Sequence, residues 1–145
     1  MYRILGNLYQ GPMLKELAPN MLPNAIVNLM SNEEIDLTIK SLGFAQQSSE
    51  IKAHIHLPIA DGPNPGMDWL KMAVGIVESL MEKHTVYIHC RGGISRSAML
   101  AAAVLMKVKK WRSHDKALNF LAEKNPSIDP APNFVKILKE FEREV

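Results

Sequence analysis

Residues 89–97, which read His-Cys-Arg-Gly-Gly-Ile-Ser-Arg-Ser, have the residue types and spacing that phosphate chemistry needs. Cys90 is the single cysteine of the chain, and Arg96 follows it by six positions. A thiolate is a strong nucleophile, and a guanidinium is a planar fork of donors that can hold two phosphate oxygens. Gly92 and Gly93 allow positive φ angles and a close approach of backbone N–H groups to an anion. The pattern predicts a phosphate-binding loop with a nucleophile at its base.

The neighbours of Cys90 and Arg96 suggest supporting roles. A hydroxyl at Ser97 could donate to the sulfur and ease departure of the thiolate, although Ser97 could equally be the N-cap of a following helix. His89 is expected to hold the loop and tune the thiol rather than to transfer a proton. The segment expected to bind the phosphate group consists of Arg91, Gly92, Gly93, Ile94, Ser95 and Arg96.

Two regular elements should position this loop. The β-branched and aromatic residues at 85–89 predict a buried strand, and the apolar, helix-forming run at 97–110 predicts a buried helix. A strand, a glycine-bearing turn and a helix start make an anion site, because consecutive N–H groups converge and the positive end of the helix faces them. These dipoles, together with Arg96, favour the thiolate form of Cys90.

Phosphoryl transfer to sulfur also needs an acid for the leaving oxygen, and a carboxylate on a separate loop can supply it. Asp61 is the only acid in the turn-rich segment 59–66, which follows a predicted strand at 54–58. Asp68 is the competitor. It falls in the first turn of a predicted helix at 67–82, where an acid is explained by the helix dipole. Asp61 is therefore the preferred candidate, with a turn-capping role as the alternative.

Taken together, these residues resemble the small dual-specificity branch of the cysteine-dependent protein tyrosine phosphatases. The loop around Cys90 and the upstream Asp61 carry the likeness, and residues 8–11, 25–29 and 132–142 resemble the family's opening strand, second strand and closing helix. Many relatives have alanine at Gly92, a departure expected to be harmless.

The resemblance implies residue roles and an activity. Cys90 falls on the nucleophile and Arg96 on the phosphate-binding arginine. Ser97 falls on the loop hydroxyl and Asp61 on the general acid. The implied activity is hydrolysis of phosphotyrosine, and also of phosphoserine and phosphothreonine, in protein substrates through a cysteinyl-phosphate intermediate.

The order of elements predicts an α/β fold in one domain, residues 1–145, with a mostly parallel, twisted sheet of four or five strands flanked by helices on both faces. Such sheets bind ligands at the carboxyl ends of their strands. A strand at 8–11 and a short helix are expected first. The later elements are strands at 25–30, 54–58 and 85–89, helices at 33–42, 67–82, 97–110, 114–124 and 133–144, and a surface loop at 43–53.

Composition narrows the expected partners. A net charge of +2 and a pI near 8.7 are too mild to indicate a nucleic-acid partner. The basic residues at 107–112 are better explained as a solvated helix end than as a docking site for acidic substrates. The longest apolar run, 98–106, is too short to span a membrane. We expect a monomer in the cytoplasm, where a single thiol stays reduced, with no cofactor. No metal site is expected, since His54 and His56 have no acidic neighbour.

Other functions remain open at this stage. Sulfur transfer also uses a cysteine in a cradle of amides, but it does not explain Arg96, Ser97 and Asp61. A phosphate-binding module without catalysis would be favoured by loss of the nucleophile, the arginine or the acid, and all three are present. Within the same chemistry, a phosphoinositide or an RNA 5′-phosphate could be the substrate. Because Ile94 is apolar and Arg91 is the only extra base in the loop, we favour a phosphoprotein. The sequence has no Asn-Arg-Tyr element of the kind that walls the deep cleft of the larger tyrosine phosphatases, so we expect a shallow cleft.

Overall fold

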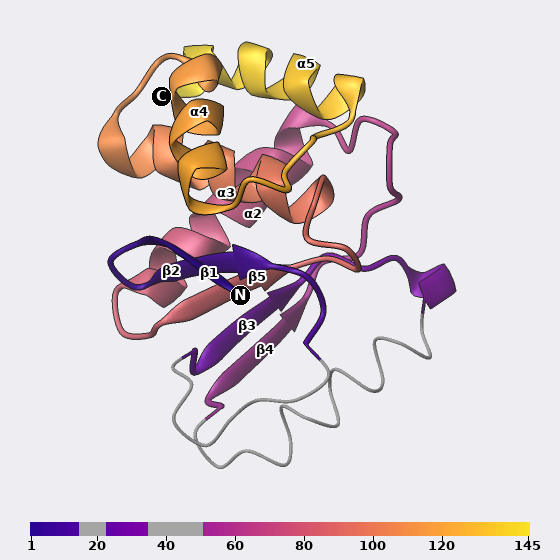
Figure 1. Ribbon diagram of the computed structural model, residues 1–145, viewed down its shortest axis with the longest axis vertical. Coiled ribbons are helices and arrows are strands. Elements are labelled where there is room, and N and C mark those ends of the chain that lie inside the picture. Colours follow the sequence, from indigo (N-terminus) through magenta and orange to yellow (C-terminus); the bar gives the residue numbers. More distant parts are fainter. Residues whose placement is uncertain (15–22, 35–50) are drawn as a thin grey trace.

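The computed structural model describes residues 1–14, 23–34 and 51–145, and these residues form an α/β fold around one twisted sheet (Figure 1). The five strands are β1 (Tyr2–Leu5), β2 (Leu8–Gly11), β3 (Ala25–Asn28), β4 (Ala53–His56) and β5 (Val86–His89). Their order is β1-β2-β5-β3-β4, and only β1 runs antiparallel to its neighbour. The predicted fold class is confirmed.

Strand β1 is an element that the sequence analysis did not anticipate. It pairs with β2 as a hairpin, in which Leu5 lies opposite Leu8 across a turn at Gly6 and Asn7. The turn requires the positive φ of 44° that Gly6 adopts. An edge strand of four residues with one fully buried side chain has too little alternation to be recognised by periodicity. The other four strands lie within two residues of their predicted positions.

The helices follow the predicted ranges closely. They are α2 (Met67–Met81), α3 (Arg96–Lys109), α4 (His114–Lys124) and α5 (Pro132–Phe141), with short 3₁₀ helices η1 (Asn32–Glu34) and η2 (Glu142–Glu144). Most of the expected helix at 33–42 and of the loop at 43–53, and the short helix after the first predicted strand, lie outside the described residues.

Helix α3 forms the centre of the core. Every side chain from Ala98 to Met106 is fully buried, because α3 packs on β2 and β5 and is covered by α2, α4 and α5. These four helices lie on one side of the sheet in Figure 1. The sequence predicted helices on both faces of the sheet. In the described part of the chain, the α-helices cover one face. No helix there is both long and apolar enough to cross a lipid bilayer.

Candidate active site

Strand β5 lies between β2 and β3 and delivers Cys90 to the carboxyl edge of the sheet. Its last residue, His89, is in register with Gly11 of β2 and Asn28 of β3, so all three strands end at the same level. Cys90 follows immediately and is 3% exposed. This is the edge at which parallel α/β sheets place their ligand sites.

The first turn of α3 differs from the expectation for Ser97. The N-cap residue is Ser95, whose hydroxyl accepts a hydrogen bond from the backbone N–H of Ala131 at 2.9 Å rather than capping α3. Ser97 lies inside the helix, with its Oγ 3.2 Å from the Cys90 Sγ. The N-cap alternative for Ser97 is therefore wrong, and its hydroxyl lies within hydrogen-bond distance of the sulfur.

Of the two loop glycines, only Gly93 has the backbone conformation that favours glycine. Its φ is +72°, and a Cβ there would lie 2.4 Å from Gly11 C and from Pro12 N. Gly92 has no positive φ, and a Cβ there would make an ordinary contact of 3.6 Å with Ile94. The conformational freedom that both glycines allow is therefore used at Gly93 alone, where the loop approaches the end of β2.

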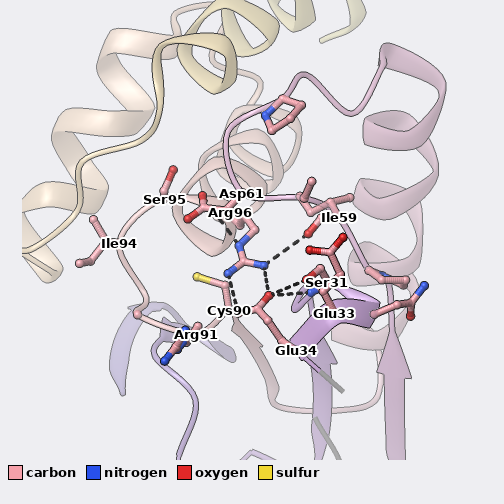
Figure 2. A pocket seen from close by; sticks show the side chains of 15 residues that line it. Ser31, Glu33, Glu34, Ile59, Asp61, Cys90, Arg91, Ile94, Ser95 and Arg96 are labelled. Carbon is pink, nitrogen blue, oxygen red and sulfur yellow. Dashed lines mark hydrogen bonds and ion pairs between the residues drawn. The ribbon is translucent and has the colours of Figure 1, made fainter. Parts of the chain in front are cut away.

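Arg96 is held by an acid that the sequence analysis did not identify. Its Nη1 donates to Glu34 Oε1 at 2.6 Å and to the Ile59 carbonyl oxygen at 3.3 Å, and its Nη2 donates to Glu34 Oε2 at 3.3 Å. Figure 2 shows the guanidinium pointing at this carboxylate within the cleft. The hydrogen bond from Arg96 lowers the pKa of Glu34 to about 2, against the opposing effect of burial, so Glu34 is ionised at neutral pH.

A signal for Glu34 was present in the sequence. Glu34 follows the predicted strand at 25–30, and a parallel neighbour of the cysteine strand must end at the same edge of the sheet. The predicted helix at 33–42 hid it, because an acid in a first turn is ordinarily explained by the helix dipole.

The Nε of Arg96 has a different environment. It is buried and makes no hydrogen bond within the described residues. Asp61 Oδ1 lies 3.9 Å from it, and the Asp61 side chain is 62% exposed. Burial alone would lower the pKa of Arg96, but the hydrogen bond to Glu34 and the negative charges of Cys90, Glu34 and Asp61 raise it overall. A buried, charged donor that makes no hydrogen bond is a place where an anionic oxygen would bind.

The two candidate acids are clearly separated. Asp61 lies on the loop after β4 and lines the cleft above Cys90 and Arg96. Asp68 is an exposed residue in the first turn of α2 and does not line it. The structure therefore brings Asp61, and not Asp68, to the cysteine and the arginine.

His89 is buried, with 1% of its surface exposed, and its ring stacks on Tyr87. Its Nδ1 donates to the Cys90 carbonyl oxygen at 3.2 Å, and burial lowers the pKa of His89 to about 4. The imidazole is therefore neutral at physiological pH, and this environment fits the expected role of holding the loop.

Beneath the loop lies a buried amide pair that the sequence analysis also missed. Gln10 of β2 donates through Nε2 to Ser97 Oγ and to the Gly93 carbonyl oxygen, both at 2.8 Å, and Asn125, at the end of α4, donates to Gln10 Oε1 at 2.9 Å. Period-two alternation could have found it, since Gln10 shares the inward face of β2 with the fully buried Leu8.

These groups surround one cleft of about 920 Å³. Its rim is mixed in character, because Ile94 is 43% exposed, Arg91 is exposed, and Glu33 and Asp61 bring negative charge. The lining residues are Ser31, Asn32, Glu33, Glu34, Pro58, Ile59, Ala60, Asp61, Pro63, Cys90, Arg91, Gly92, Ile94, Ser95 and Arg96.

Comparisons with known proteins agree with this geometry. The chain is 38% identical over 141 residues to a putative tyrosine phosphatase, 123R, of Invertebrate iridescent virus 6, covering 97% of this chain and 91% of the viral protein. It is 30% identical over 144 residues to human dual specificity protein phosphatase 16, covering 99% of this chain but only 21% of that protein. The crystal structure of human DUSP28 has the same fold, with a TM-score of 0.81, 19% identity, and coverage of 99% of this chain and 96% of that one.

The family model described as "Dual specificity phosphatase, catalytic domain" matches residues 13–144, nearly the whole chain. This match includes both the loop around Cys90 and the upstream Asp61. The chain belongs to the dual specificity phosphatase catalytic domain family, a family of phosphatase enzymes.

Proposed function

We propose that this protein hydrolyses phosphate monoesters on proteins, phosphotyrosine foremost and phosphoserine and phosphothreonine more slowly, through a cysteinyl-phosphate intermediate. One juxtaposition carries the proposal. The Cys90 sulfur, the Nε of Arg96 and the Asp61 carboxylate face one cleft. This Nε makes no hydrogen bond within the described residues, and the Asp61 oxygen lies 3.9 Å from it. A nucleophile, a phosphate clamp and an acid are the three groups that the two-step reaction requires.

In the first step, the Cys90 thiolate attacks phosphorus and the bond to the leaving oxygen breaks. Arg96 and the loop N–H groups bind the non-bridging oxygens and stabilise the charge that develops on them. Asp61 gives its proton to the leaving oxygen, so that an alcohol or phenol departs rather than an alkoxide or phenoxide.

In the second step, water attacks the phosphocysteine. Asp61, now ionised, removes a proton from the water, and the S–P bond breaks to release phosphate and the thiolate. Ser97, 3.2 Å from the sulfur, donates a hydrogen bond to the departing thiolate. The residues close the cycle without a further group.

The charges around the cleft support a phosphoprotein rather than a polyphosphorylated lipid or RNA. Glu33 and Asp61 line the cleft, whereas Arg91 is the one exposed base in the loop. A substrate with several phosphates would meet these carboxylates at unfavourable distances. A single phosphate on a peptide places its charge on Arg96, and its aromatic ring can lie against the exposed Ile94.

The test begins with Cys90→Ser, which should abolish turnover of p-nitrophenyl phosphate while tungstate still protects the folded protein from thermal unfolding. Retained turnover would exclude Cys90 as the nucleophile. The wild-type chain is then assayed against phosphotyrosine and phosphoserine peptides, a phosphoinositide and an RNA 5′-triphosphate at equal concentration. Preferred hydrolysis of the lipid or the RNA would replace the proposed substrate class, and binding without turnover of any substrate would indicate a non-catalytic phosphate-binding module.

A further inference from the structure

Ser97 can act on the Cys90 sulfur only if its hydroxyl hydrogen points there. The Ser97 Oγ lies within reach of three groups, namely Cys90 Sγ at 3.2 Å, the Gly11 carbonyl oxygen at 3.4 Å and Gln10 Nε2 at 2.8 Å. A hydroxyl has one hydrogen to give and accepts on its lone pairs. Which partner receives that hydrogen therefore depends on the direction of the hydrogen bond with Gln10.

That direction can be traced from a backbone N–H, whose polarity is fixed. The N–H of Ser127 donates to Asn125 Oδ1 at 3.1 Å, so the other end of this side-chain amide is the donor Nδ2. Asn125 Nδ2 then donates to Gln10 Oε1 at 2.9 Å. This orients the Gln10 amide, whose Nε2 must face the Gly93 carbonyl oxygen and Ser97 Oγ, both at 2.8 Å.

Ser97 consequently accepts from Gln10, and its own hydrogen is left for Cys90 Sγ or for Gly11. When the sulfur is charged, it is the stronger and nearer acceptor. This series of hydrogen bonds is shielded from water, because Gln10 and Ser97 are 0% exposed and Asn125 is 1% exposed. Inside such a site, one reversed amide would leave a donor or an acceptor unpaired, which is costly.

We infer that Gln10, oriented by Asn125, is a positioning residue that sets the polarity of the Ser97 hydroxyl so that it donates to the Cys90 thiolate when the phosphocysteine breaks down. The inference rests on the proposed two-step phosphatase reaction. It assigns Gln10 a role in the second step. In that step the thiolate is the leaving group, and a hydrogen bond that stabilises it favours its departure. In the first step the thiolate is the attacking group, and the same hydrogen bond gives no such advantage.

The first test is Gln10→Met, which keeps the length of the side chain and removes its donors. Rapid mixing with p-nitrophenyl phosphate and acid quenching separates formation of the phosphoenzyme from its breakdown. Breakdown should slow about fivefold while formation changes less than about twofold, as expected for an interaction that acts mainly in one step. Equal slowing of both steps, or no change in breakdown, would overturn the inference.

The second test is Asn125→Asp, which keeps the acceptor for the Ser127 N–H but removes the donor to Gln10. Gln10 Oε1 would then face a carboxylate oxygen, and turning the amide to avoid it would set Oε1 against the Gly93 carbonyl oxygen. Either arrangement disturbs the hydrogen bond from Gln10 Nε2 to Ser97 Oγ and with it the direction of the hydroxyl. Breakdown should slow in the same way. This variant also keeps the inference testable if Gln10→Met does not fold.

A double-mutant cycle isolates the path through Ser97. In a Ser97→Ala background, Gln10→Met should have no further effect on breakdown, because the hydroxyl on which it acts is gone. A persisting effect would mean that Gln10 acts by another route. Asn7→Asp is the matched control, since Asn7 donates to the Met81 and His84 carbonyl oxygens at the opposite end of the sheet. It should change stability alone. If the wild-type protein does not turn over substrate, the proposed function fails. If the wild-type protein is active and Gln10→Met has the same rates of phosphoenzyme formation and breakdown, only this inference fails.

Discussion

At the scale of single residues, the site depends on how the charges around Arg96 are divided. One edge of the guanidinium binds Glu34, which is ionised because its pKa is about 2. The Arg96 Nε makes no hydrogen bond in the described part of the chain, and Asp61 Oδ1 lies 3.9 Å from it. The Glu34 pair fixes the orientation of the arginine, and the other edge remains available for phosphate.

Asp61→Asn should lower kcat for p-nitrophenyl phosphate by about 100-fold and remove the basic limb of the pH–rate profile, because the first step needs a protonated acid at this position. Asp68→Asn removes the same charge from an exposed site outside the cleft and is the control. Steady-state rates from pH 5 to 9 decide the matter. An unchanged profile for Asp61→Asn would place the acid elsewhere.

Glu34→Gln should weaken binding of phosphate and tungstate and lower kcat/KM about tenfold, because the amide holds Arg96 without a charge and the guanidinium loses its fixed orientation. Inhibition constants for the two oxyanions measure this directly. Glu33→Gln removes a charge from the same segment without touching Arg96, so an effect common to both variants reports the charge of the cleft rather than the ion pair. Equal oxyanion affinity in Glu34→Gln and wild type would contradict the orienting role.

At the scale of elements, the shape of the loop is set by the strand beside it. The N–H of Met13, just after β2, donates to the Arg91 carbonyl oxygen at 3.1 Å, and Gly93 packs directly against Gly11 and Pro12. From the other side, the buried helix α3 carries both Arg96 and Ser97. The loop is thus held between β2 and α3, and the distance between these two elements sets the path of its backbone.

Gly93→Ala should therefore damage both folding and activity, because its Cβ would lie 2.4 Å from backbone atoms of Gly11 and Pro12 at a φ of +72°. We expect a loss of stability of about 2 kcal/mol or more, and at least about a tenfold loss of kcat/KM. Gly92→Ala is the matched control and should behave like the wild type. Urea unfolding and phosphatase assays test both variants, and similar behaviour of the two would refute this account of the loop.

At the scale of the whole molecule, stability in acid depends on two histidines of the sheet, His54 on β4 and His89 on β5, and on Glu34 of η1. Burial lowers the pKa of both His89 and His54 from 6.5 to about 4, so the native state keeps both rings neutral where the unfolded chain would protonate them. Glu34 acts in a lower range, because its pKa is about 2 in the native state and 4.5 ordinarily. Both effects make stability fall as the pH falls, first from about 6.5 to 4 and then from about 4.5 to 2.

The free energy of unfolding should accordingly drop by roughly 4 kcal/mol between pH 7 and pH 5, about half of it from each of the two histidines. His54→Leu should reduce this drop and leave stability at pH 7 unchanged or higher, because neither ring nitrogen of His54 has a hydrogen-bond partner in the described residues. Denaturant titrations of both proteins at pH 7, 6 and 5 make the comparison. Parallel pH curves for the two would remove His54 from the explanation.

The sequence by itself determined the general fold and predicted the chemistry of the site. Three local patterns carried the prediction: the spacing of Cys90 and Arg96, the run of apolar residues after them, and Asp61 as the lone acid in a turn-rich segment. Local patterns can be recognised from the sequence alone. Apart from β1, the positions of the described strands and α-helices followed from periodicity for the same reason.

Tertiary structure alone decided which polar groups meet. Glu34 and Arg96 are 62 residues apart, and Gln10 and Asn125 are 115 apart, so no local pattern links either pair. They meet because β2, β3 and β5 end at one edge of the sheet and the C-terminal end of α4 lies beneath the phosphate loop. The proposed nucleophile, Cys90, and its proposed phosphate clamp, Arg96, are local features of the chain. The orientation of Arg96 and of the Ser97 hydroxyl depends instead on the packing of distant elements.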